Sequence, residues 1–83
     1  MKKPKRPVKV IRRKLGREKA DGLCTFDGNV HVDERLYGIE HMETLLHELL
    51  HNEFQFLSEE AVDAAAKSMA TTMYDDHWRR VEQ

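Results

Sequence analysis

Two histidines four residues apart, His47 and His51, enclose Glu48 in the pattern H-E-x-x-H. In a helix, positions i and i+4 project only about 40° apart, so both imidazoles can reach one metal ion. Zinc binds imidazole nitrogen and lowers the pKa of the water that it activates to about 7. The pattern therefore predicts zinc binding by the two histidines, with Glu48 as the general base that takes a proton from that water.

The residues around the motif favour the helix that this geometry needs, from Ile39 or Glu40 to about Phe54. Apolar side chains form one broad stripe on a helical wheel, as in a core-facing helix, at Met42, Leu45, Leu46, Leu49 and Leu50. The two histidines fall on the opposite side. The plain alternative is an ordinary amphipathic helix with a solvated polar face. Because spacing, residue types and helix agree, we favour the metal site.

A second helix is predicted to begin after a short connector, 55–57, and offers a third ligand. Ser58 suits the N-cap, and Glu59 and Glu60 suit the positive end of the helix dipole. Stepping back three residues from the apolar Val62 reaches Glu59, which therefore faces the first helix, whereas Glu60 faces solvent.

The short connector makes the two helices antiparallel neighbours, so Glu59 begins its helix near the end of the other. We predict Glu59 as the third metal ligand and keep Glu60 as the alternative. It is equally open that Glu59 binds no metal and only interacts favourably with the positive end of the helix dipole. Three weaker ligand candidates are His41, Asp63 and His77.

The part before the motif predicts short strands. Residues 8–15 combine apolar and strongly basic side chains, which is typical of an edge strand. Residues 23–26 and 30–32 flank Asp27-Gly28-Asn29, a hairpin signature. His31 alternates with valines and is predicted to be exposed rather than a ligand. The expected fold class is α+β: a short antiparallel sheet of two to three strands, followed by two antiparallel helices.

The 83 residues predict one small domain, 8–83, after a basic disordered lead-in, 1–7. At this length, folding buries only about 60–65% of the surface of the unfolded chain, so a bound metal would add useful stability. Ten of the fourteen Lys and Arg residues lie between Lys2 and Lys19, whereas residues 20–83 carry fourteen acids. The basic arm could bind nucleic acid, fold onto the acidic body or stay solvated.

Cellular location is constrained by cysteine usage and hydropathy. The single Cys24 cannot form an internal disulfide and is predicted to be a small, half-buried strand residue, which fits a cytoplasmic protein. The sequence has no apolar run long enough to span a membrane.

The hairpin, the H-E-x-x-H helix and the Leu57-Ser58-Glu59-Glu60 start of the second helix together resemble the minimal zincin-type metallopeptidase-like proteins of phages and prophages. These are related in pattern to the ImmA/IrrE and SprT-like peptidases. The resemblance covers roughly residues 8–76 and implies that His47, His51 and Glu59 bind zinc while Glu48 is the base. The segment between His51 and Glu59 is much shorter than in the larger enzymes.

The leading expectation is thus a small cytoplasmic zinc metallopeptidase whose partner is a peptide or protein substrate. The alternative is a non-catalytic, zinc-stabilised module whose basic N-terminal arm binds nucleic acid or an acidic partner protein. A third possibility is a plain domain of two helices and a hairpin, without metal.

Overall fold

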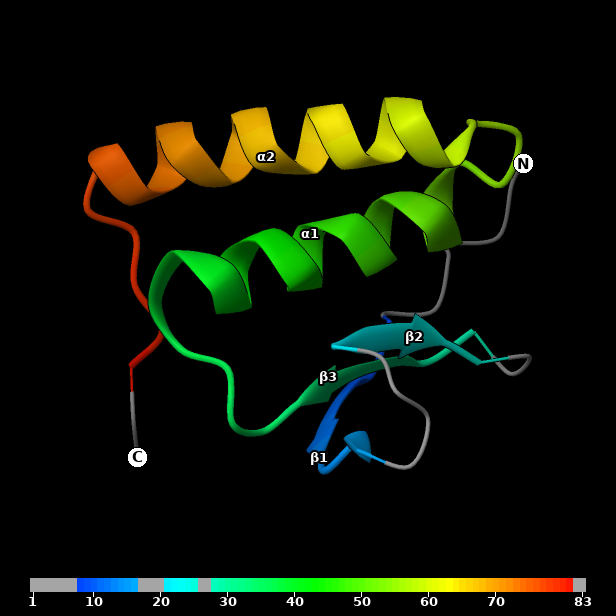
Figure 1. Ribbon diagram of the computed structural model, residues 1–83, viewed down its shortest axis with the longest axis horizontal. Helices are drawn as coiled ribbons and strands as arrows, with labels where there is room; N and C mark the ends of the chain where they lie inside the picture. Colours follow the sequence, from blue (N-terminus) through cyan, green and yellow to red (C-terminus); the bar gives the residue numbers. More distant parts are fainter. Residues whose placement is uncertain (1–7, 17–20, 26–27, 82–83) are drawn as a thin grey trace, which may run out of the picture.

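The computed structural model describes residues 8–16, 21–25 and 28–81. Its elements follow the order β1 (Val10–Arg13), β2 (Gly22–Cys24), β3 (Val30–Asp33), α1 (Gly38–Glu53) and α2 (Glu59–Asp75). Helix α1 packs against α2 on one side and against β2 and β3 on the other, which gives three layers (Figure 1). The α+β class is confirmed. The predicted lead-in, 1–7, and the hairpin residues Phe26 and Asp27 lie outside the described residues.

The sheet is mixed, so the prediction of a purely antiparallel sheet was wrong. Its order is β1-β3-β2, with β2 antiparallel to β3 as the hairpin predicted, and β1 parallel to β3. The chain reverses direction between β1 and β2 and again between β2 and β3, so β1 and β3 point the same way. Because β3 is the central strand and lies next to β1, these two strands pair in parallel. The apolar β3 suits the central place because its two valines are completely buried, whereas the charged β1 lies at an edge.

One face of the sheet supports α1. Val30 and Val32 lie on that face, and Gly22 is paired with Val32 in the neighbouring strand. A Cβ atom on Gly22 would lie 2.7 Å from Cγ2 of Thr44 and 3.0 Å from Cγ of Glu48. The absent side chain therefore allows β2 to approach the helix that carries the H-E-x-x-H pattern.

The bounds of α1 and the start of α2 agree with the sequence prediction to within about two residues. The helices run antiparallel, as the short connector predicted (Figure 1). Ser58 is the N-cap of α2, where its Oγ accepts a hydrogen bond from the backbone N–H of Ala61 at 3.1 Å. At the other end, His77 adopts φ 67°, and the Trp78 N–H donates to the Met73 carbonyl at 2.9 Å, the pattern of a Schellman motif.

The apolar face of α1 is only half covered. Its five predicted core residues all remain partly exposed, and the fully buried apolar side chains are Leu15, Val30, Val32, Val62, Ala66 and Ala70. A sheet with strands of three or four residues is too small to cover the 16 residues of α1. Part of the leucine stripe is therefore left as surface.

Asp33, at the end of β3, is a charged residue with only 2% of its surface exposed. Its carboxylate accepts hydrogen bonds from the Arg35 guanidinium at 3.0 and 2.7 Å and from the backbone N–H of Leu15 at 3.3 Å. The side-chain hydrogen bonds from Arg35, followed by the Arg35 backbone N–H, hold the pKa of Asp33 well below its usual range. This network fixes the turn between β3 and α1.

Neither α1 nor α2 is long and apolar enough to cross a membrane, and the described part of the chain holds no other helix that is.

Candidate metal centre

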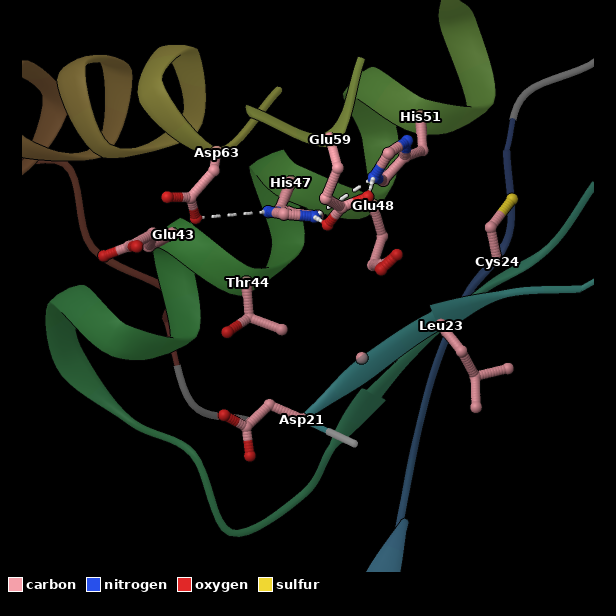
Figure 2. A pocket seen from close by; sticks show the side chains of 11 residues that line it. Asp21, Leu23, Cys24, Glu43, Thr44, His47, Glu48, His51, Glu59 and Asp63 are labelled. Carbon is pink, nitrogen blue, oxygen red and sulfur yellow. Dashed lines mark hydrogen bonds and ion pairs between the residues drawn. The ribbon is translucent and has the colours of Figure 1, made fainter. Parts of the chain in front are cut away.

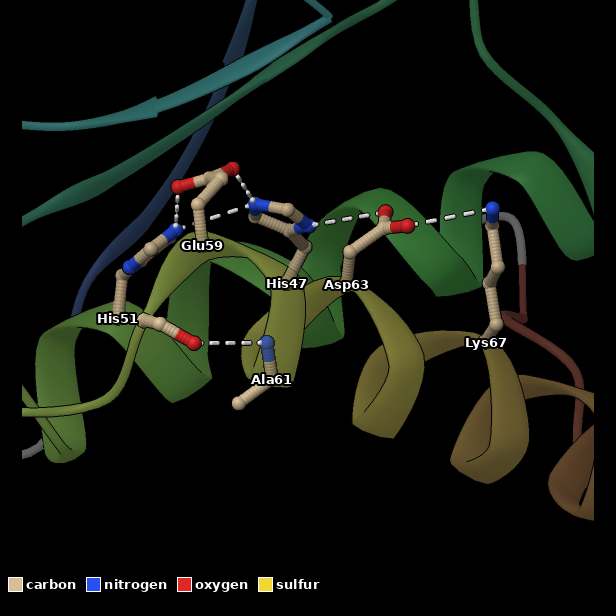
Figure 3. A network of polar contacts seen from close by, with 7 residues as sticks. His47, His51, Glu59, Ala61, Asp63 and Lys67 are labelled. Atoms are coloured by element: carbon tan, nitrogen blue, oxygen red, sulfur yellow. Dashed lines mark hydrogen bonds and ion pairs between the residues drawn. The ribbon is translucent and has the colours of Figure 1, made fainter.

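Three side chains with metal-binding atoms converge at the facing ends of α1 and α2. The Nε2 atoms of His47 and His51 lie 3.1 Å apart. The Glu59 carboxylate spans both rings, with Oε1 2.8 Å from Nε2 of His47 and Oε2 2.7 Å from Nε2 of His51 (Figure 3). One donor atom from each residue lies within 4.8 Å of the others, so this group could hold a metal ion.

The local structure explains this convergence. The two histidines are one helical turn apart, and their ring centroids are 4.8 Å apart. The five residues between α1 and α2 bring the start of α2 back beside the end of α1, and Ser58 caps that start. Glu59, the first residue of α2, therefore faces the rings. The structure brings Glu59, rather than Glu60, to the two histidines.

The donor set fits a zinc ion in its spacing and chemistry. Zinc bonds of about 2.0–2.1 Å in a tetrahedral arrangement place ligand atoms about 3.3 Å from one another. The two Nε2 atoms, 3.1 Å apart, need to separate by only a few tenths of an ångström, whereas the contacts of 2.8 and 2.7 Å reach different oxygens of Glu59, so that binding through one of these oxygens also requires a rotation of the carboxylate. Two histidines and one glutamate also match a common ligand set of catalytic zinc sites, which leave a fourth position open.

Glu48 lies beside this group and is almost completely buried, with 8% of its surface exposed. It projects from α1 towards β2 (Figure 2). Burial raises the pKa of its carboxyl group, and the nearby imidazoles of His47 and His51 oppose that shift in part. A carboxylate with a raised pKa, next to a cluster of metal-binding atoms, is suited to accept and return a proton.

A second carboxylate approaches the other nitrogen of His47. Asp63, one turn after Glu59 on α2, has Oδ1 3.8 Å from Nδ1 of His47, and its Oδ2 lies 3.2 Å from Nζ of Lys67 (Figure 3). The sequence suggested Asp63 as a weak ligand candidate. The structure instead places it behind the ring, where it can favour a proton on Nδ1 and leave Nε2 for a metal.

An open cleft of about 530 Å³ lies in front of the three side chains. Its far wall is formed by Asp21 and strand β2, including Cys24 (Figure 2). Cys24 is exposed, so its prediction as a half-buried residue was wrong. The face on which a strand residue lies depends on pairing, which the short run 23–26 did not reveal. Sequence reasoning also missed β2 as a wall of the cleft.

The other histidines lie apart from this group. His41 is buried and accepts a hydrogen bond from Nε of Arg12 at 3.1 Å. His31 is half-buried rather than exposed as predicted, because it accepts a hydrogen bond from Nε of Arg13 at 2.9 Å, and it is not among the grouped ligands. His77 lies exposed beyond α2.

Comparison of the chain with protein-family models, with curated proteins and with solved structures finds no match.

Proposed function

We propose that this chain is a small zinc-dependent metallopeptidase-like protein of the zincin type, in which His47, His51 and Glu59 hold zinc and Glu48 is the general base. The observation that carries the proposal is the convergence of three donor atoms within 4.8 Å, next to a buried carboxylate. In the metal-free alternative the same two Glu59 contacts are hydrogen bonds from imidazole N–H groups, so metal analysis distinguishes the two readings.

The residues of the chain have distinct tasks in this proposal. The zinc that His47, His51 and Glu59 would hold would supply a Lewis acid that polarises the scissile carbonyl and lowers the pKa of water to about 7. The Glu48 carboxylate takes the proton from the attacking water and delivers it to the departing amine nitrogen, so the C–O bond forms and the C–N bond breaks without a net change at Glu48. Because the pKa of Glu48 is raised, its proton affinity lies closer to that of the attacking water and the departing amine, with which it exchanges the proton.

A peptide is the substrate class that fits the cleft. β2 ends the sheet order β1-β3-β2, so within the described ranges no strand pairs with its outer edge, and β2 lines the cleft. An extended peptide can add to such an edge through backbone hydrogen bonds, irrespective of its side chains. The proposal retains the cytoplasmic location inferred from the sequence.

The first experiment is metal analysis of protein purified without a histidine tag, followed by turnover of a quenched fluorescent peptide library. We expect about one zinc per chain in the wild type, and no zinc in His47→Ala. Glu48→Gln should keep its zinc yet lose at least about 10²-fold in turnover, because it removes only the general base.

Glu43→Gln is the matched control, since Glu43 lies in the same cleft and on the same helix as Glu48. We expect it to retain both zinc and turnover. Zinc binding without turnover in the wild type would support the non-catalytic, zinc-stabilised alternative. If Glu48→Gln loses zinc and unfolds, Glu48 is structural and the peptidase proposal fails.

A further inference from the structure

A second cavity lies on a different face of α1 from the metal-binding cleft. It has a volume of about 440 Å³ and shares no lining residue with the cleft. Its floor is the half-covered leucine stripe of α1, with Leu45, Leu46 and Leu49, and Met73 and Trp78 border it from α2 and the segment that follows. We refer to this cavity as the leucine groove.

The rim of the leucine groove is positively charged. Arg12 of β1 and Arg79 and Arg80 after α2 line it, and among the residues that the structure describes none of those lining it is acidic. Arg79 is held in place, because its Nη1 donates hydrogen bonds to the carbonyls of Tyr74 and Trp78 at 2.9 and 2.8 Å and its guanidinium lies 3.4 Å above the Tyr74 ring. An occupant should therefore combine apolar side chains with acidic neighbours.

The loop between α1 and α2 has these properties. Phe54 and Phe56 are 42% and 83% exposed and pack edge to face, with centroids 6.1 Å apart. Exposed acids flank them at Glu53 and Glu60, and residues 53–60 contain no lysine or arginine. We refer to residues 53–60, which are the loop 54–58 together with the last residue of α1 and the first two of α2, as the phenylalanine loop. Exposed aromatic pairs of this kind are typical of interface anchors.

The phenylalanine loop cannot reach the leucine groove of its own chain. The groove is lined from Tyr37 to Leu49, whereas the loop follows the last residue of the same 16-residue helix. Most of the groove lies towards the N-terminal end of α1, and neither Phe54 nor Phe56 lines it in the folded chain. The two surfaces therefore do not meet within this folded chain, and a second copy can bring them together.

We propose that two copies of this chain associate head to tail, with the phenylalanine loop of one copy seated in the leucine groove of the next. Phe54 is already more than half covered, so the two phenylalanines together would bury less than twice the area of a whole aromatic side chain, about 150–250 Å², well below the roughly 800 Å² per partner of a stable complex. The association is therefore weak and depends on concentration. Because each copy keeps one free loop and one free groove, it can continue into longer chains.

Sedimentation velocity over a range of protein concentrations tests this proposal. We expect the average mass of the wild type to rise above that of one chain as concentration increases, and less so at high salt, which screens the rim arginines. Phe56→Ser should remove this rise, because it removes the anchor. Arg80→Glu should remove it too, because it places an acid opposite the acidic loop.

A mixture of these two variants gives the sharpest test. Phe56→Ser keeps a working groove and Arg80→Glu keeps a working loop, so the mixture should form 1:1 dimers that grow no further. Met69→Ser, which changes an exposed apolar residue outside the groove, should associate like the wild type. Circular dichroism confirms that each variant is folded.

A peptide spanning residues 52–58 provides a second probe and should dissociate the wild-type assembly, whereas the same peptide with both phenylalanines replaced by serine should not. The proposal is overturned if the wild type stays a single chain at every concentration, if Phe56→Ser associates like the wild type, or if the mixed variants do not pair.

Discussion

At the scale of single residues, Asp63 lies next to the Nδ1 atom of His47 and not next to the Nε2 atom that faces Glu59, so we expect it to orient the ring rather than to bind a metal itself. Its 3.8 Å approach to Nδ1 exceeds hydrogen-bond range, so its influence on the ring is electrostatic or needs a small movement. Second-sphere carboxylates are typically worth 10–100-fold in metal affinity. We therefore expect Asp63→Asn to weaken zinc binding by about tenfold, measured by competition with a chromogenic chelator. Asp75→Asn, at the exposed end of α2, is the control, and equal affinities in all three proteins would contradict this role for Asp63.

Asp33 predicts a dependence of stability on pH. Its hydrogen bonds from Arg35 hold its pKa in the folded protein below the unfolded value of about 3.9. The ionised carboxylate therefore stabilises the fold above about pH 4, and that contribution is lost as pH falls through this value towards the folded pKa. We expect Asp33→Asn to lower the free energy of unfolding at pH 6, and the deficit to narrow at pH 3. Urea unfolding at both pH values measures this, and a constant deficit would count against it.

At the scale of elements, the contact between β2 and α1 depends on Gly22. An alanine there would meet Cγ2 of Thr44 at 2.7 Å, on an element that cannot retreat without disturbing the core. We expect Gly22→Ala to lower the free energy of unfolding by about 1–3 kcal/mol, the usual range for overpacking. Serine at position 44 removes the Cγ2 atom, so Gly22→Ala should cost less in a Thr44→Ser background. A double-mutant cycle by urea unfolding measures this, and additive costs would contradict the clash.

The elements also show how far sequence reasoning reaches. The helices were predictable from the spacing of apolar residues and from the N-cap Ser58. The approach of His47 to His51 was predictable because the two residues are one helical turn apart. The place of Glu59 was predictable because the connector is short. The parallel pairing of β1 was not, because it depends on which strand takes the centre of the sheet. The exposed state of Cys24 was missed for the same reason, since burial of a strand residue depends on its neighbours.

At the scale of the whole molecule, the small size of the sheet determines how much of the apolar face of α1 is covered, and the sequence did not predict this. The leucine stripe of α1 predicted a covered core face, yet the short strands cover only part of it. The lead-in, 1–7, lies outside the described residues, so its disorder and its binding to nucleic acid stay predictions.

Such a small core makes stability sensitive to the metal. Zinc at a free concentration 100 times its dissociation constant adds about 2.7 kcal/mol to the folded state. At about 4–8 °C per kcal/mol for a domain of this size, chelation should lower Tm by roughly 10–20 °C, measured by thermal melting with and without EDTA. His51→Ala, which lacks one ligand, should show no response to zinc. An unchanged Tm in the wild type would show that the three side chains do not bind a stabilising ion.

Ser58 caps α2 and Glu59 is its first residue, whereas His47 and His51 lie within α1. Helix ends open far more often than whole domains unfold. Opening that one turn withdraws the carboxylate and leaves both imidazoles in position. We therefore expect the residence time of a bound ion to depend on the fraying of this single turn, so that loss of the Ser58 hydroxyl, which caps the turn, would speed the release of the ion.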